Sequence, residues 1–222
     1  GHFTLMGHGR FSVRKGRLVP SGKGLGLLAR SMAELGDARA LAAGVAGNGL
    51  FVAKADRKSD VHRPALLDLI GIPDSDGKLE LFLGLFTADV YAAELASLPW
   101  LRRKAKMVQD HFGYAPFSHN GRLLSNILET LPRDLLYQDD ESALIRLAQG
   151  VLDLQARSRV ALFLLPDPFK RFVQALVYVP REGYDTQLRL SLQRLIEEAA
   201  GGHVIGQTVL VNDSALARFH LV

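Results

Sequence analysis

Apolar and polar residues in the last third of the chain follow a regular succession of strand and helix patterns. The unbroken apolar run over residues 160–165 predicts a short strand buried on both faces, and residues 172–179 predict a second strand after a Pro-rich turn. From about Thr186 onwards, apolar residues recur at helical spacing, with charged and amide side chains on the opposite side. Residues 204–211 and 216–221 predict two further strands. Together with a preceding helix, these elements predict a ferredoxin-like α+β layer in a shifted order.

Three amphipathic helices are predicted in the middle of the chain. In the first, Ser97 supplies the N-cap, Pro99 lies in the first turn, and apolar residues recur every three or four positions. Ser118 caps the second helix, and Pro132 ends it because proline lacks the backbone donor that a helix interior needs. The third helix begins near Asp140, where an acidic start complements the positive end of the helix dipole.

The first third of the chain predicts a small mixed α/β sheet. Glycines interrupt the first β-type stretch, which is typical of a bulged or bent strand. A turn over residues 74–77 precedes the last strand of this region. The predicted elements are a strand over 2–14, a helix over 31–43, a strand over 50–54, one or two helical turns over 64–70, and a strand over 79–87.

These patterns place the chain in the α+β class with three parts. Residues 1–95 form a small mixed α/β module, and residues 96–156 form a helical connector. Residues 157–222 form a ferredoxin-type module with an antiparallel sheet and helices on one face. The chain begins without Met and ends in strand-like sequence, so we expect both ends to continue in a longer polypeptide.

Composition narrows the class of protein further. Hydrophobic residues make up 48% and charged residues 23% of the 222 residues, as in an ordinary folded chain. No apolar run approaches the roughly 20 residues that span a bilayer, and no signal-peptide pattern opens the chain. We therefore predict a cytoplasmic protein without membrane association. The absence of cysteine excludes disulfides, thiolate zinc ligands and thiol catalysis.

Basic residues are concentrated in two stretches, although the net charge is only +4. Six Lys and Arg residues, and no Asp or Glu, precede Glu34. The second cluster, in the first predicted helix, consists of Arg102, Arg103, Lys104 and Lys106. Nucleic-acid binding would require such residues to be combined with exposed aromatic side chains or a recognised motif. We therefore interpret the second cluster as a solvated helix face.

No pattern typical of catalysis or metal binding occurs in the sequence. The Gly-rich stretches 22–26 and 44–49 lack the context of phosphate- and dinucleotide-binding loops, so we interpret them as turns. Ser59, Asp60 and His62 carry the residue types of a catalytic triad but lie within four positions, whereas triads are assembled from distant segments. The seven His residues have no metal-ligand spacing.

A small group of cationic residues is the candidate for ligand binding. Lys54 ends a predicted strand, and His62 and Arg63 lie in the following loop, where a cation could meet a ligand carboxylate. A solvated rim or a salt bridge between domains is the alternative interpretation. Arg181 is a candidate with the same two interpretations. It could contact Asp185 at the start of the following helix, or a partner subunit.

Sequence blocks along almost the whole chain carry a family resemblance. The longest covers residues 167–189 and contains the turn Val-Pro-Arg-Glu-Gly-Tyr between a strand and an amphipathic helix. Departures from the family occur at Leu66 and Leu69, where an aromatic residue is usual, and at His8, where Tyr is usual. The other blocks are residues 3–7, 24–26, 61–71, 82–87, 118–121 and 126–134. In this order the blocks resemble the non-catalytic N-terminal half of the large bacterial NAD-dependent glutamate dehydrogenases.

The resemblance implies a parent enzyme that oxidatively deaminates L-glutamate to 2-oxoglutarate with NAD, in a catalytic domain downstream of Val222. It implies a PAS-like first module, helical connectors and an ACT-like last module, which bind amino-acid effectors or mediate subunit contacts. The segment itself is then non-catalytic and holds no cofactor or metal. Its expected partners are the catalytic half of the same polypeptide, other subunits of a homo-oligomer, and an amino-acid effector. The effector or interface candidates are Lys54, His62, Arg63, Asp167, Phe169, Arg181 and Tyr184.

Two other functions stay open at this point. The segment could be purely a scaffold, with its exposed strand edges and helix faces packed on the catalytic half and on other subunits. Binding of nucleic acid through the basic N-terminal stretch is a third and less favoured hypothesis, since generic charge alone gives salt-sensitive, non-specific attraction.

Overall fold

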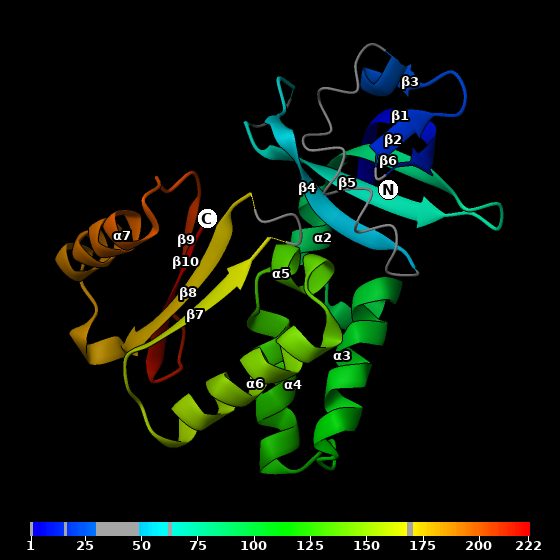
Figure 1. Ribbon diagram of the computed structural model, residues 1–222. Coiled ribbons are helices and arrows are strands. Elements are labelled where there is room, and N and C mark those ends of the chain that lie inside the picture. The colour runs from blue at the N-terminus through cyan, green and yellow to red at the C-terminus, as the bar shows by residue number, and fades with distance from the viewer. Residues whose placement is uncertain (1, 16, 30–48, 62–63, 168–170) are drawn as a thin grey trace. The chain divides into compact units, whose positions relative to one another are not determined.

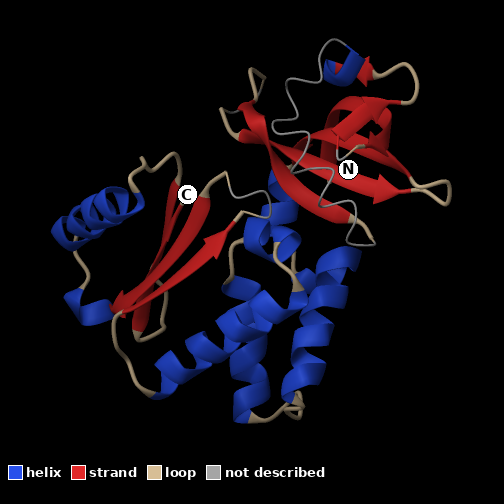
Figure 2. Cartoon of the chain, viewed as in Figure 1, coloured by secondary structure: helices blue, strands red, loops and turns tan. Residues whose placement is uncertain are grey.

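The computed structural model describes residues 2–15, 17–29, 49–61, 64–167 and 171–222. These residues form helices and antiparallel strands, which confirms the predicted α+β class (Figure 2).

The described chain forms two compact units, whose elements are labelled in Figure 1. The first unit consists of Gly1–Leu101 together with Arg133–Gln138. The second consists of Arg102–Pro132 and Asp139–Val222. The chain thus leaves the first unit, returns to it for six residues, and leaves it again.

An antiparallel sheet forms the body of the first unit. Its strands are β1 (Phe3–Arg14), β2 (Arg17–Pro20), β3 (Leu25–Gly26), β4 (Phe51–Lys58), β5 (Leu66–Pro73) and β6 (Lys78–Phe86). They follow the order β2-β1-β6-β5-β4, and β3 pairs with β1. A β-bulge between Leu5 and Gly7 bends β1, as the interrupting glycines predict.

Alternating apolar residues bury one face of this sheet. Leu79, Leu81 and Leu83 on β6 and Leu67 and Leu69 on β5 are almost fully buried. The register places Leu69 directly opposite Leu83, so these side chains share a face. Burial of this layer stabilises the first unit, since apolar area removed from water stabilises by about 25 cal/mol per Å².

The prediction of helical turns over residues 64–70 is wrong. Residues 66–73 form β5, which pairs with β4 on one side and β6 on the other. Pro64 precedes this strand instead of opening a helix, and the apolar residues are buried at a period of two. The helix predicted over residues 31–43 lies outside the described residues. The PAS-like assignment of this module stays a prediction.

Short helices follow the sheet of the first unit. They are α2 (Ala88–Ala92), a 3₁₀ helix (Leu95–Ser97) and α5 (Arg133–Gln138). The longer helix α3 (Pro99–Phe112) begins in the first unit and continues in the second. The prediction that Ser97 caps α3 is wrong, because its hydroxyl donates to the carbonyl of Glu94 within the 3₁₀ helix.

Two long helices of the second unit begin where their capping residues predict. They are α4 (His119–Thr130) and α6 (Glu141–Ala156). The side chains of Ser118 and Asp140 accept hydrogen bonds from the amide three residues later, at 3.1 and 2.7 Å. Each cap satisfies a first-turn N–H that has no partner within its helix.

The second unit also contains the predicted strand–strand–helix–strand–strand module. Its elements are β7 (Ala161–Pro166), β8 (Val173–Pro180), α7 (Thr186–Ala200), β9 (Gln207–Leu210) and β10 (Leu216–Leu221). The sheet order is β7-β8-β10-β9, with every neighbouring pair antiparallel. The prediction that the first of these strands is buried on both faces is wrong. Burial alternates along β7, which lies at the edge of the sheet, and Leu162 and Leu164 on one of its faces are 50% and 59% exposed.

Helices contact both faces of the second sheet. On one face, the apolar side of α7 packs against Val177 and Phe219, as the helical spacing predicts. On the other face, Arg218 donates to the carbonyl of Thr130 in the last turn of α4, and Phe163 lies beside Gly150 of α6. The helix of the predicted ferredoxin-type module therefore covers one face, while helices of the predicted connector contact the other.

We expect Gly150→Ala to destabilise the second unit, even though alanine favours helices. A methyl group at Gly150 would overlap the ring of Phe163. Overpacking of this kind costs about 1 to 3 kcal/mol. The obstructing group is a side chain, so Phe163→Leu should restore part of the stability in the double variant. Urea unfolding of both single variants and the double variant measures this coupling, and strictly additive effects would contradict the contact.

Candidate functional site

The Lys54 side chain on β4 connects several elements of the first unit. Its Nζ lies 2.5 Å from Oδ1 of Asp68 on β5 and 3.1 Å from Oδ1 of Asp134 on α5. The Oδ2 atom of Asp68 accepts the backbone N–H of Phe86 at 2.8 Å. The hydroxyl of Tyr91 on α2 donates to Oδ1 of Asp134 at 3.1 Å. Three strands and two helices therefore meet at one buried ammonium group.

Two carboxylates share this single ammonium group. Burial acts to lower the pKa of Lys54, but Asp134 and Asp68 outweigh it and raise that pKa above its ordinary value. Burial also raises the pKa of Asp68, and Asp134 adds to this rise while Lys54 opposes it. The raised pKa of Lys54 favours an ionised pair, whereas the raised pKa of Asp68 favours a protonated carboxyl. The ammonium contacts both carboxylates, so we take Lys54 as charged and Asp68 as the group that binds a proton on acidification.

The cationic ligand site predicted around Lys54 is described only in part. Lys54 forms ion pairs with Asp68 and Asp134, both of which belong to its own unit. His62, Arg63 and Phe169 lie outside the described residues. Since 80 positions separate Lys54 from Asp134, no local sequence pattern indicates their contact.

The remaining candidates lie at opposite ends of β8. Asp167 follows β7, and its buried carboxylate is 2.9 Å from Nε of Arg171. Arg181 and Tyr184 follow the far end of β8. Arg181 donates to the carbonyl of Asn212 at 2.9 Å, and Tyr184 packs against the apolar cluster beneath α7. The structure therefore does not bring Asp167 together with the other two.

The turn between β8 and α7 has a structural explanation. Asp185 is the N-cap of α7, and its carboxylate accepts the N–H of Leu188 at 2.6 Å. The anionic partner considered for Arg181 thus stabilises the helix start. The backbone N–H of Arg181 donates to the carbonyl of Ala215 at 2.8 Å, which fixes the turn against the residue before β10.

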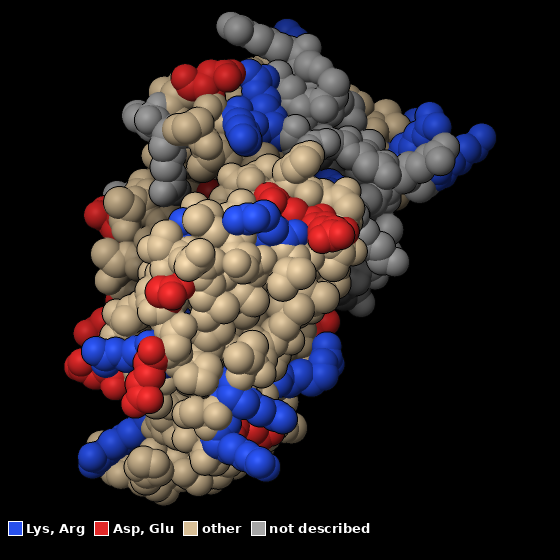
Figure 3. Space-filling view, turned by 90° about the vertical axis from the view of Figure 1, so that its left-hand side faces the viewer, with Lys and Arg blue, Asp and Glu red and all other residues tan. Residues whose placement is uncertain are grey.

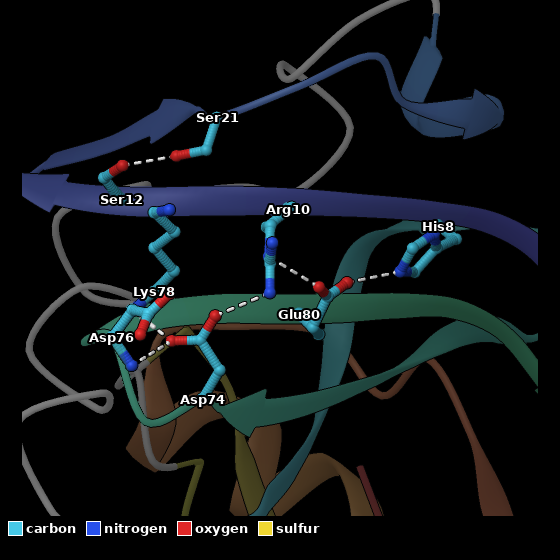
Figure 4. Close-up of polar contacts among 8 residues, drawn as sticks. All are labelled: His8, Arg10, Ser12, Ser21, Asp74, Asp76, Lys78 and Glu80. Carbon is cyan, nitrogen blue, oxygen red and sulfur yellow. Dashed lines mark hydrogen bonds and ion pairs between the residues drawn. The ribbon is translucent and has the colours of Figure 1, made fainter.

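A second polar network crosses the partly exposed face of the first sheet (Figure 4). At its centre, Glu80 lies 2.5 Å from Nε2 of His8 and 2.8 Å from Nε of Arg10. Arg10 also pairs with Asp74 at 2.8 Å, and Asp74 holds the predicted turn by accepting two of its amides. Arg10 and Glu80 are directly opposite on β1 and β6. The Arg10–Glu80 contact is a cross-strand ion pair, which the polar residues at alternate positions 8 and 10 could have indicated.

Lys104 departs from the solvated face predicted for its basic cluster. Its Nζ donates to the backbone carbonyl of Asp139 at 2.7 Å, whereas Arg102, Arg103 and Lys106 are exposed. Burial lowers the pKa of Lys104 to about 8, although Asp139 and its neighbour oppose the shift. Burial likewise raises the pKa of Asp139 to about 6, against the effect of Lys104. The solvated-face interpretation is therefore wrong for Lys104 and agrees with the other three.

This pair predicts a pH window of reduced stability. The folded-state pKa of Asp139 is above its ordinary value of 3.8. Ionised Asp139 therefore lowers the free energy of unfolding, and this loss is absent below pH 3.8 and complete above about pH 6. The folded-state pKa of Lys104 is below its ordinary value of 10.5. Charged Lys104 therefore also lowers the free energy of unfolding, and this loss is complete below about pH 8 and absent above pH 10.5. We expect Lys104→Met/Asp139→Asn to gain about 2 kcal/mol over the wild type near pH 7, and less at pH 4 or 10.5.

Urea unfolding at those three pH values tests the prediction. The matched control is Lys106→Met/Asp110→Asn, which removes an exposed pair from α3. Exposed pairs contribute little, so this control should show no such window. A gain for the buried pair that is equal at all three pH values would refute the titration argument.

The Gly-rich loop before β3 does not fit a dinucleotide. A side chain at Gly24 would overlap the carbonyl of Leu28, and one at Gly26, whose φ is 58°, would overlap the carbonyl of Met6. These glycines therefore permit close backbone packing, which leaves no room there for a pyrophosphate. The described residues that follow the loop form a three-residue 3₁₀ helix (Leu27–Ala29).

The described residues do not form other kinds of site. No group of three or more His, Cys, Asp and Glu residues there could hold a metal ion. No helix in the described part of the chain is both long and apolar enough to span a membrane. On the face drawn in Figure 3, basic and acidic side chains are interspersed, without the continuous basic stripe of a nucleic-acid surface.

Comparisons with known proteins match two parts of the second half of the chain. Residues 161–222 match the family described as glutamate dehydrogenase, ACT2 domain. Residues 98–157 match glutamate dehydrogenase, helical motif 1. The matched ACT2 region contains the sheet of the second unit and α7, so the predicted ACT-like module is confirmed.

Three relatives extend the match to the remaining residues. The NAD-specific glutamate dehydrogenase of Halomonas elongata is 39% identical over 175 residues, which are 77% of this chain and 11% of that protein. The enzymes of the same name from Pseudomonas aeruginosa and Mycobacterium tuberculosis are 32% and 29% identical over the whole chain. The chain spans 15% and 14% of their lengths. The chain therefore belongs to the NAD-specific glutamate dehydrogenase family, as a segment that carries helical motif 1 and the ACT2 domain.

Proposed function

We propose that this chain is a regulatory and assembly segment of a cytoplasmic NAD-dependent glutamate dehydrogenase. The parent enzyme converts L-glutamate, NAD and water to 2-oxoglutarate, ammonium and NADH, and binds NAD in a catalytic domain outside this chain. The match of residues 161–222 to the ACT2 domain carries the proposal. The small share of the relatives' length that the chain spans supports a segmental role.

The ionisable groups of the segment support a role in conformation rather than in chemistry. Lys54 pairs with two carboxylates on other elements of its unit, and Asp167 pairs with Arg171 within the connection between β7 and β8. An amino-acid effector would act by binding one arrangement of the segment more tightly than another. A ligand shifts such an equilibrium only by its difference in affinity for the two states.

Isothermal titration of the isolated chain with each common amino acid and with 2-oxoglutarate tests the sensing role. We expect saturable heat with at least one of these compounds. A nucleotide titration with NAD serves as a control that should give no heat. Flat heats for every amino acid and for 2-oxoglutarate would contradict effector sensing and leave only the assembly role.

The edge strand β7 favours assembly as the second candidate function. Its six residues carry no charge, although charged residues commonly protect exposed strand edges from pairing. Leu162 and Leu164 project on the same face as the residues paired with them on β8, yet they stay half exposed. We propose that another subunit of the enzyme covers this edge.

Sedimentation of the isolated chain tests the assembly role. Leu162→Lys/Leu164→Lys should shift an associating wild-type chain to the monomer, because two charges then lie on the pairing strand. Leu190→Lys, at a 40% exposed position on α7, is the matched control and should not change association. A wild-type chain that is monomeric at every concentration would contradict self-association through β7.

A further inference from the structure

Helix α5 belongs to the first unit but lies far from it in the sequence. Residues 133–138 pack with the first sheet, while the residues on both sides of them, 102–132 and 139–222, belong to the second unit. The chain therefore crosses between the units three times, and two of these crossings flank α5. Without α5 in place, a single crossing within α3 would connect the units.

The stability of α5 depends on its docking. Six residues make fewer than two turns, and isolated helices shorter than about 12 residues are marginal in water. Leu135 and Leu136 are buried, and the ring of Tyr137 stacks on Phe86 at 4.4 Å between centroids. These residues form the apolar contact surface between α5 and the rest of the first unit.

Polar contacts at the start of α5 fix its position on that apolar surface. Arg133 donates to the carbonyl of Ala93 at 2.9 Å. Asp134 accepts from both Lys54 and Tyr91 at 3.1 Å. The Lys54–Asp68 pair joins two strands of the sheet and does not involve α5. The contacts of Asp134 therefore distinguish the docked helix from the undocked one.

We propose that α5 is a latch, which the partly buried Lys54–Asp134–Tyr91 contact holds on the first sheet and whose release frees the two units to move relative to each other. After release, the chain passes between the units once instead of three times, and the sheet stays folded. The excess of one carboxylate over ammonium at Lys54 favours this reversibility, because Asp68 still neutralises the ammonium after Asp134 departs. The latch requires neither an effector nor the activity of the parent enzyme.

Hydrogen exchange of the whole chain tests the latch. In Asp134→Ala, the amides of α5 should exchange at least tenfold faster than in the wild type, while those of β5 and β6 keep their rates. Asp134→Asn retains an acceptor for Lys54 and Tyr91 and should fall in between. Asp110→Ala, which removes an exposed carboxylate from α3, is the control without effect. Equal acceleration in the sheet, or none in α5, would overturn the proposal.

A distance measurement separates release of the latch from local fraying. The chain contains no cysteine, so spin labels at Ser75→Cys in the first unit and Ser191→Cys in the second are the only thiol-linked labels. Both positions are exposed. Asp134→Ala should broaden the distance distribution between them, whereas Asp110→Ala should not. An unchanged distribution in Asp134→Ala would show that α5 does not restrain the units.

Discussion

Lys54→Met is expected to lower the free energy of unfolding by about 3 to 5 kcal/mol at pH 8, since breaking a buried ion pair leaves an uncompensated charge. Methionine retains the apolar stem but leaves Asp68 and Asp134 without their shared ammonium group. Asp68 then binds a proton more readily in the folded state than in the unfolded chain. The loss should therefore be smaller at pH 5 than at pH 8. Urea unfolding at both pH values measures it.

Two control variants separate charge from packing. Lys106→Met removes one partner of an exposed ion pair and should cost less than about 0.5 kcal/mol. Lys54→Met/Asp68→Asn removes one of the two stranded charges and keeps an acceptor for the N–H of Phe86, so it should be more stable than Lys54→Met alone. A loss in Lys54→Met no greater than in Lys106→Met would refute the buried ion pair.

The elements that the sequence predicts well have local determinants. Ser118 and Asp140 cap α4 and α6, and both caps depend on an amide only three residues away. The apolar positions of α7 recur at 3.6-residue spacing, and its αL residue Gly201 ends it. Periodicity and capping are properties of short segments, so one sequence is sufficient to detect them.

The wrong and missing predictions depend on contacts between distant segments. A proline at residue 64 suggests a helix start, but pairing with two neighbouring strands makes 66–73 a strand. Strand β7 has the apolar run of a strand buried on both faces, yet it lies at the edge of the sheet and every second side chain, all on one face, is exposed. Lys54 is a candidate for ligand binding by sequence, and its contacts with Asp134 and Asp68 come from positions 80 and 14 residues away, which no local pattern indicates. Tertiary pairing, rather than local propensity, decides each of these cases.

Gly121→Ala is expected to destabilise the second unit by about 2 to 3 kcal/mol, the range for overpacking a closely packed contact. Alanine is the better helix former by about 1 kcal/mol, so propensity alone predicts the opposite sign. However, a methyl group at Gly121 in the first turn of α4 would overlap the carbonyl of Ala115 in the preceding loop. The obstruction is backbone, so no side-chain truncation relieves it, in contrast to Gly150→Ala.

Gly183→Ala, at a position with open space around it, is the matched control and should change stability by less than about 1 kcal/mol. Thermal unfolding of the two variants decides whether the loop or the helix propensity dominates, and a more stable Gly121→Ala would show that the loop yields.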